Sequence, residues 1–323
     1  MPLSPEAQRV VDNSAARMAK AMHETPVAEL RAALAANAVP VVTPIRHRRD
    51  VVVPCAGGGV RVRIYRPSDD PGLPVVQWMH SGGFAVGNLD QNEEYLRKLS
   101  IASQAVIVSV DYRLAPEHPC PAALDDCRKV WEWIKSAPDE LSTADVTKAV
   151  LAGESAGGAL VFTLSHQLRE AGLPLPDAQV SLYGTAVMQV TNPEHSTALL
   201  SPEDCQWFWD MYVPNRADQA SPIASPGLAP DLGGLPPALV VTAEIDPTRD
   251  GTEKYARHMQ EAGVPVELRR YEGMMHGFAT MTTALPAANE LFDQIVEYLA
   301  EVFTRQGLPG GSGNRSSDLV FSR

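Results

Sequence analysis

The sequence predicts an α/β fold, with an eight-stranded, mostly parallel sheet and helices on both of its faces. Six short apolar runs alternate with segments of helical character, a pattern typical of a parallel sheet that is covered on both sides. Ahead of them, two β-rich runs flank three glycines, which indicates an antiparallel hairpin. The six runs are 74–79, 105–110, 149–153, 179–183, 238–243 and 266–271, and the hairpin comprises 51–54 and 60–65.

Helical segments account for most of the remaining chain. Those between or after the apolar runs are 92–104, 122–136, 156–171, 249–262 and 287–303, and two more, 6–22 and 27–37, precede the hairpin. Residues 191–229 interrupt the alternation with an aromatic cluster and several prolines. Open α/β sheets bind ligands at the carboxyl edge of their strands. We therefore expect this insertion and the N-terminal helices to form a cap over that edge.

This pattern predicts three parts along the chain. Residues 1–45 form an N-terminal helical cap segment, and residues 46–305 form the catalytic domain, which carries the cap insertion near 191–229. Residues 306–323 are rich in glycine and serine, a composition typical of a flexible tail.

Composition narrows the range of partners. The 323 residues are 45% hydrophobic and 20% charged, as in ordinary globular proteins. The net charge of −12 repels phosphate backbones and anionic membrane surfaces, so we expect neither nucleic acid nor membrane as a partner. The polar N-terminus and the absence of a run of about 18 apolar residues predict a cytoplasmic location.

The four cysteines give no sign of a metal site. Cys55, Cys120, Cys127 and Cys205 lack paired C-x-x-C spacing and flanking histidines. We expect free thiols and no metal, with a Cys120–Cys127 disulfide as the alternative.

The most informative motif is Gly153-Glu154-Ser155-Ala156-Gly157, which joins an apolar run to a helical segment. Glycines permit a tight strand-to-helix turn, and such a turn exposes the serine hydroxyl at the amino end of a helix. The motif predicts that Ser155 is a nucleophile; the alternative is a glycine-rich turn that carries a passive serine.

A nucleophilic serine needs a base, and the base needs an orienting partner. His276 follows the run 266–271 and Asp246 follows the run 238–243, so both lie at the strand edge that carries Ser155. The order serine, acid, histidine is that expected for a strand–Ser–helix motif of this kind. We predict that His276 is the general base and that Asp246 orients it, with Asp250 as the nearest rival carboxylate.

The segment His80-Ser81-Gly82-Gly83-Phe84 follows the run 74–79. The backbone N–H groups of Gly82, Gly83 and Ala156 are candidates to bind the oxyanion that develops during acyl transfer. Ser81, Phe84, Trp207, Trp209 and Tyr212 are candidate pocket residues. The aromatic residues of the insertion belong either to the substrate wall or to the core of the cap.

Taken together, these motifs resemble the hormone-sensitive lipase family of α/β-hydrolases, also called bacterial family IV esterases. The matching segments are 80–84, 111–118, 153–158, 246–250 and 276–278, within a resemblance that extends over about residues 40–303. The resemblance implies an α/β-hydrolase fold with a cap, and hydrolysis of short-chain carboxylic esters without cofactor or metal. It also implies that His80 braces the oxyanion loop. Homodimers are consistent with it, although no interface can be located in the sequence.

One position departs from the family pattern. The loop usually reads His-Gly-Gly-Gly, but Ser81 replaces its first glycine. If that position requires a positive φ, Ser81 strains the loop by about 1 kcal/mol or more. Otherwise its hydroxyl bonds within the loop or reaches the substrate.

Three other functions remain open at this point. A true lipase would act on aggregated lipid, but it would need a large apolar lid face, and the predicted cap is short and mixed in composition. An amidase or deacetylase would use the same triad, and a small-molecule receptor on the same fold would bind without catalysis.

Overall fold

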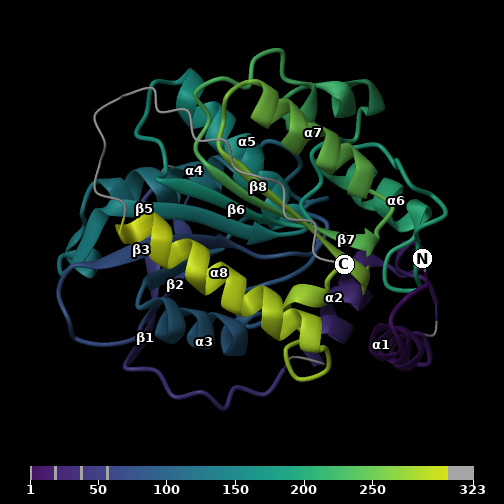
Figure 1. Cartoon of the computed structure of the whole chain (residues 1–323), viewed down its shortest axis with the longest axis horizontal. Helices are drawn as coiled ribbons and strands as arrows, with labels where there is room; N and C mark the ends of the chain where they lie inside the picture. The colour runs from purple at the N-terminus through teal and green to yellow at the C-terminus, as the bar shows by residue number, and fades with distance from the viewer. Residues whose placement is uncertain (1, 18–19, 37–38, 56–57, 305–323) are drawn as a thin grey trace.

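The computed structural model describes residues 2–17, 20–36, 39–55 and 58–304, so the predicted tail 306–323 lies outside the described residues. Eight strands form one sheet in the order β1-β2-β4-β3-β5-β6-β7-β8 (Figure 1). The strands are β1 (His47–Val53), β2 (Val60–Arg66), β3 (Leu73–Met79), β4 (Val106–Asp111), β5 (Ala144–Glu154), β6 (Ala178–Leu182), β7 (Ala238–Ile245) and β8 (Val266–Met275). β2 pairs antiparallel with both β1 and β4, and the other pairs are parallel. The predicted architecture is confirmed.

Burial explains why the central strands have continuous apolar sequences. All eight residues of β7 are buried, whereas the first four residues of the edge strand β1 are exposed. In β3, side chains point alternately to the two faces. Val75 and Met79 join one hydrophobic cluster, while Val76 and Trp78 join another on the opposite face.

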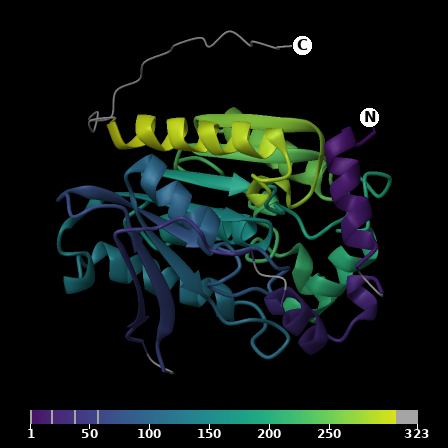
Figure 2. The ribbon, with the colours of Figure 1, turned by 90° about the horizontal axis from the view of Figure 1, so that it is seen from below.

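Helices cover both faces of the sheet. α3 (Glu93–Ser103) and α8 (Pro286–Thr304) pack together on one face, and α4 (Ala122–Lys135), α5 (Ala156–Glu170) and α7 (Arg249–Glu261) cover the other. Figure 2 shows α8, in yellow, along the outer side of the sheet. Short 3-10 turns, η2 (Asp139–Leu141) and η5 (Phe278–Thr280), complete this part of the fold.

The N-terminal segment contains α1 (Pro5–Ala15), η1 (Met22–Glu24) and α2 (Val27–Ala36). The prediction of a helix over 6–22 is therefore wrong at its carboxyl end, because α1 ends at Ala15 and Met22 lies in a separate 3-10 turn. The last turn of α1 contains Asn13 and Ser14, whose side chains compete with helical hydrogen bonding. The insertion between β6 and β7 contains α6 (Pro202–Tyr212), η3 (Arg216–Ala220) and η4 (Pro226–Leu228), and α6 contacts η1.

Polar contacts attach the N-terminal segment to the rest of the molecule. The backbone N–H of His23 donates to Asp204 Oδ1 at 2.9 Å, and His23 Nδ1 lies 2.8 Å from the same oxygen. Arg31 Nε and Nη2 donate to the carbonyls of Ala85 and Ala115, both at 2.8 Å. The segment is thus tied to α6 and to the loops that follow β3 and β4.

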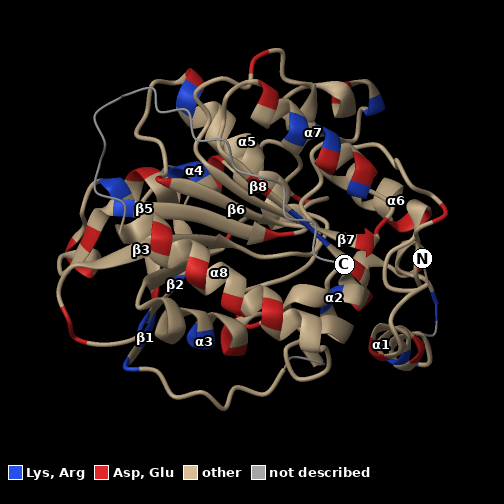
Figure 3. Ribbon diagram, viewed as in Figure 1, with Lys and Arg blue, Asp and Glu red and all other residues tan. Residues whose placement is uncertain are grey.

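Charged residues lie mainly on helices and loops, and Figure 3 shows both signs mixed along α7. Within the described ranges, no helix is both long and apolar enough to cross a membrane. All four cysteines are free thiols, so the alternative of a Cys120–Cys127 disulfide is wrong.

Candidate active site

Ser155 lies at the sharp junction between β5 and α5, with φ 53° and ψ −118°. The flanking glycines are required by close packing. A Cβ atom on Gly157 would lie 2.0 Å from the carbonyl oxygen of Met79, and one on Gly153 would lie 2.6 Å from the backbone of Gly157. The sequence motif therefore encodes a turn that only these small residues permit, and it presents the serine hydroxyl at the amino end of α5.

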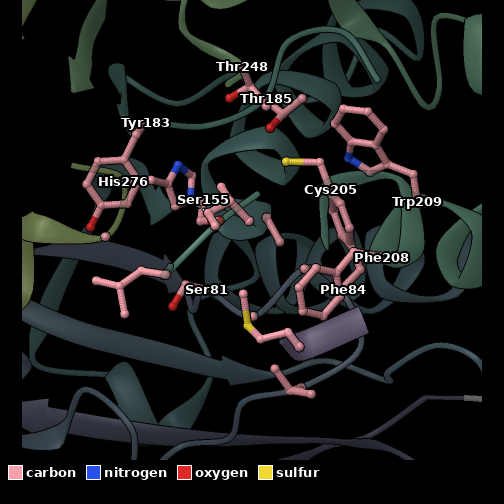
Figure 4. A pocket seen from close by; sticks show the side chains of 18 of the residues that line it. Ser81, Phe84, Ser155, Tyr183, Thr185, Cys205, Phe208, Trp209, Thr248 and His276 are labelled. Carbon is pink, nitrogen blue, oxygen red and sulfur yellow. Dashed lines mark hydrogen bonds between the residues drawn. The ribbon is translucent and has the colours of Figure 1, made fainter. Parts of the chain in front are cut away.

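The three predicted triad residues meet at the carboxyl edge of the sheet. His276 Nε2 lies 2.8 Å from Ser155 Oγ, and His276 Nδ1 lies 2.7 Å from Asp246 Oδ2. Asp246 directly follows β7 and His276 directly follows β8. Figure 4 shows the imidazole between Ser155 and Tyr183, at one end of the pocket. This continuous chain of hydrogen bonds is the arrangement by which a histidine activates a serine hydroxyl.

Asp246 is held as an anion with one oxygen aimed at the histidine. Its Oδ1 accepts hydrogen bonds from the backbone N–H and the hydroxyl of Thr248, both at 2.8 Å. Burial alone would raise the pKa of Asp246, but the charge and hydrogen bond of His276 and the two Thr248 donors lower it below its ordinary value. The rival Asp250 is bonded instead to Asn192 and Arg249.

The predicted oxyanion loop, residues 80–84, contains residues with a positive φ, including Gly82 at 124° and Gly83 at 56°. The backbone N–H groups of Gly82, Gly83 and Ala156 donate to no acceptor among the described residues, and all three residues line the cavity. A Cβ atom on Gly83 would lie 2.3 Å from the ring of Phe208. The loop thus offers free donors in a position that tolerates no side chain.

His80 supports this loop from below. Its Nδ1 donates to the carbonyl of Ser81 at 2.7 Å, and its ring stacks on Tyr112 with centroids 4.2 Å apart. The Tyr112 hydroxyl donates to the carbonyl of His80 at 2.8 Å. Burial lowers the pKa of His80, which keeps the ring neutral. These contacts agree with the bracing role that the family resemblance implies.

Ser81 is accommodated without backbone strain. The side-chain-bearing residue with positive φ in this loop is Phe84, at 63°, and not Ser81. Of the alternatives left open by the sequence, a strained Ser81 is therefore excluded. Its hydroxyl instead accepts a hydrogen bond from Gln91 Nε2 at 2.6 Å, within the same loop.

A cavity of about 200 Å³ adjoins the triad. Of the predicted pocket residues, Ser81, Phe84 and Trp209 line it (Figure 4), whereas Trp207 and Tyr212 do not. Tyr212 stacks behind Phe84 with ring centroids 3.9 Å apart, and Trp207 packs against Phe208. The aromatic cluster of the insertion thus lines the cavity in part and packs behind the lining residues in part.

Several lining residues escaped prediction. Met22 and Leu34 come from the N-terminal segment, Gln91 from the loop after β3, and Thr185 from the loop after β6. Tyr183 packs against the His276 ring at 4.9 Å. Among these residues, Tyr183 alone had a usable signal, because it ends an apolar run and precedes a glycine.

Glu154, which precedes the nucleophile, is buried beneath the site. Its carboxylate accepts hydrogen bonds from the Tyr183 hydroxyl at 2.8 Å and from Asn92 Nδ2. It therefore anchors Tyr183, whose ring packs against the His276 imidazole.

Comparison with known families agrees with this geometry. A family described as having the alpha/beta hydrolase fold matches residues 76–280, a span that includes all three triad residues. The chain belongs to the hormone-sensitive lipase-like family of α/β hydrolases. The family resemblance predicted from the sequence motifs is confirmed.

Several relatives of this α/β hydrolase are named as esterases. It is 37% identical over 239 residues to carboxylesterase NlhH of Mycobacterium tuberculosis, covering 72% of this chain and 75% of that one. It is 33% identical over 253 residues to ethyl acetate hydrolase of Pseudomonas putida, covering 76% and 79%.

Solved structures that resemble this chain include esterases as well. The hyperthermophilic esterase of the archaeon Pyrobaculum calidifontis matches with a TM-score of 0.84 and 35% identity over 93% of this chain and 99% of that one. The thermophilic carboxylesterase EstE1, cloned from a metagenomic library, matches with a TM-score of 0.81 and 37% identity over 87% and 99%. The predicted enzyme class, a carboxylic ester hydrolase, is confirmed.

Proposed function

We propose that this α/β hydrolase cleaves short-chain carboxylic esters through a Ser155–His276–Asp246 triad and an acyl-enzyme intermediate. The observation that carries the proposal is the unbroken hydrogen-bond chain from Ser155 Oγ through both imidazole nitrogens to Asp246. A serine, a base and an orienting acid in this geometry are the parts that acyl transfer to serine requires.

The first half-reaction acylates the serine. Ser155 Oγ attacks the ester carbonyl carbon while His276 Nε2 takes the hydroxyl proton. The carbonyl oxygen becomes an oxyanion, which the N–H groups of Gly82, Gly83 and Ala156 bind. The intermediate collapses, the bond to the alcohol oxygen breaks, and His276 gives the proton to the departing alcohol. Asp246 stabilises the imidazolium while it holds the proton.

The second half-reaction reverses these roles with water. His276 Nε2 takes a proton from a water molecule, whose oxygen attacks the acyl carbon and forms a second oxyanion. The bond to Ser155 Oγ breaks, His276 returns the proton to the serine, and the carboxylic acid leaves.

The size of the cavity supports short acyl groups. A cavity of about 150 Å³ in another protein is large enough for benzene, which has six heavy atoms. The cavity beside Ser155 is about 200 Å³ and suits esters of somewhat larger size, such as a butyrate. The name of the Pseudomonas putida relative, ethyl acetate hydrolase, also refers to a small ester.

Residues 1–45 and 191–229 are proposed as the cap of the enzyme. Met22 and Leu34 line the cavity from the first segment, and Leu200 and Trp209 line it from the second. The homodimer, the cytoplasmic location and the independence from metal and cofactor stay predictions.

Hydrolysis of p-nitrophenyl esters from acetate to palmitate tests the proposal. We expect the highest kcat/KM at acyl chains of two to about six carbons, loss of activity in Ser155→Ala, and an acyl group on Ser155 detectable by mass spectrometry in quenched reactions. Undiminished turnover in folded Ser155→Ala, or a maximum at palmitate, would overturn it.

A further inference from the structure

Two polar side chains, Ser81 and Gln91, lie together in the cavity wall. Much of the remaining wall is apolar, with contributions from Met22, Leu34, Val86, Leu199, Leu200 and Phe208. The triad chemistry proposed above uses neither polar residue, and the family's usual glycine at position 81 would supply no hydroxyl. The pair is therefore a feature of this chain that the hydrolytic mechanism leaves unexplained.

The hydrogen bonds of the pair are incompletely used. Gln91 Nε2 donates to Ser81 Oγ at 2.6 Å. A serine hydroxyl can also donate one hydrogen bond, and a carboxamide oxygen can accept two. Over the part of the chain that the structure describes, the Ser81 hydroxyl donates to no acceptor and Gln91 Oε1 accepts from no donor. The pair therefore retains one donor and at least one acceptor.

The pair also lies close to the reacting carbonyl. Ser81 directly precedes Gly82, an oxyanion donor, so the two Cα atoms are about 3.8 Å apart. The hydrogen bond from His80 Nδ1 to the carbonyl of Ser81 fixes the backbone at this point. In Figure 4 the Ser81 side chain lies on the opposite side of Ser155 from Thr185. A substituent near the ester group of a bound substrate is thus within range of the pair.

We propose that Ser81 and Gln91 form a subsite for a hydroxyl group of the substrate, so that the enzyme prefers hydroxy-substituted short-chain esters to unsubstituted ones. This inference rests on the proposed ester hydrolysis at Ser155. A hydroxyl donates to Gln91 Oε1 and accepts from the Ser81 O–H, which closes a ring of three hydrogen bonds. A carboxylate offers no donor to Gln91 Oε1, and an ammonium offers no acceptor to Ser81.

The preference follows from desolvation. An unsubstituted ester displaces water from the pair and leaves a donor and an acceptor without partners, whereas a hydroxyl replaces the lost hydrogen bonds. A net hydrogen bond corresponds to about a 2- to 12-fold difference in kcat/KM. We expect a preference of this size for each hydrogen bond that the substrate hydroxyl makes.

Matched substrates test the subsite on both sides of the scissile bond. Ethyl 3-hydroxybutanoate is compared with ethyl butanoate, and 2-hydroxyethyl butanoate with propyl butanoate, by titration of the acid released at constant pH. We expect wild-type enzyme to prefer the hydroxylated member of one pair by about 2- to 12-fold or more. Ser81→Ala and Gln91→Leu each bring the ratio toward one, whereas Thr185→Val, which removes a lining hydroxyl elsewhere, keeps the wild-type ratio.

The wild-type ratios need no variant, so the subsite can be refuted even if a substitution prevents folding. If Ser81→Ala does not fold, Ser81→Gly, which restores the family's usual residue, replaces it. Ratios near one for both pairs overturn the subsite while plain esters are still hydrolysed. A preference that survives both substitutions also overturns it. Failure to hydrolyse any ester overturns the proposed function itself, so the two failures are distinguishable.

Discussion

The substitution Asp246→Asn tests the triad most directly, because the surrounding contacts dictate how the asparagine must lie. The backbone N–H and the hydroxyl of Thr248 both donate to Asp246 Oδ1. An asparagine keeps these two hydrogen bonds only if its carbonyl oxygen faces Thr248. Its amide nitrogen, a donor, then faces His276 Nδ1.

This orientation selects the wrong histidine tautomer. Nδ1 of His276 must accept from the amide, so the ring proton moves to Nε2, the nitrogen that lies 2.8 Å from Ser155 Oγ. A protonated Nε2 cannot accept the serine proton. The same change in other serine triads lowers turnover by about 10⁴, which corresponds to about 5.4 kcal/mol of transition-state stabilisation.

The assay is kcat for p-nitrophenyl butyrate under saturating substrate, with circular dichroism to establish that the variant is folded. The matched control is Asp250→Asn. Asp250 lies four residues further along the chain, and its side chain is 48% exposed. It accepts hydrogen bonds from Asn192 and Arg249 and makes none with His276. We expect its kcat to stay within a few-fold of wild type. A loss of 10⁴ in Asp250→Asn together with an active Asp246→Asn would refute the assignment.

Three further substitutions probe the loop, the pH dependence and the base of the site. Gly83→Ala forces Phe208 away and displaces an oxyanion donor, so we expect kcat to fall by about 10²–10³ in esterase assays. Burial would favour a neutral Glu94, but hydrogen bonds from Thr43 lower the pKa of Glu94 to about 2. The ionised Glu94 therefore stabilises the folded state fully above about pH 4.5, and this stabilisation disappears as the pH falls toward 2. Urea titrations should accordingly show a destabilisation by Glu94→Gln that is larger at pH 7 than at pH 2.5. Glu154→Leu leaves two buried donors unpaired, which should lower the free energy of unfolding by about 2–6 kcal/mol in urea titrations.

A specific result would contradict each of these predictions. Gly172→Ala is the control for Gly83→Ala, because Gly172 also has a positive φ, 63°, but open space around it; an equal loss in both variants would mean that backbone strain alone is responsible. A pH-independent difference between Glu94→Gln and wild type would contradict the lowered pKa. A Glu154→Leu variant as stable as wild type would show that its two donors find other partners.

The parts that could be predicted from the sequence are those encoded over a few residues. Ser155 lies in a tight turn in which backbone packing leaves room only for glycine at positions 153 and 157. Asp246 and His276 each directly follow a strand that was predicted from an apolar run. Since parallel strands end at one edge, their order along the chain implied a common site. Six of the strands followed from short apolar runs for the same local reason, and the other two followed from β-rich runs on either side of three glycines.

The parts that could not be predicted depend on how elements rotate and pack. Neighbouring residues on a helix point about 100° apart, so which of Trp207 and Trp209 faces the cavity is decided by the docking of α6, not by composition. Gln91 and Met22 come from segments whose sequences carry no chemical motif. The role of Ser81 could not be decided from the sequence, because it depends on which residue of the loop adopts the positive φ, and that residue is Phe84.

The contact between His23 and Asp204 has a consequence for protein synthesis. The two residues are 181 positions apart, yet Met22 and Cys205, their immediate neighbours, line the same cavity. At about 5–20 residues per second, a ribosome needs roughly 9–36 s to add the intervening chain. The segment that is made first therefore cannot make this contact until Asp204 has been added. Because His276 also lines the cavity, the cavity can be complete only after most of the chain has been made.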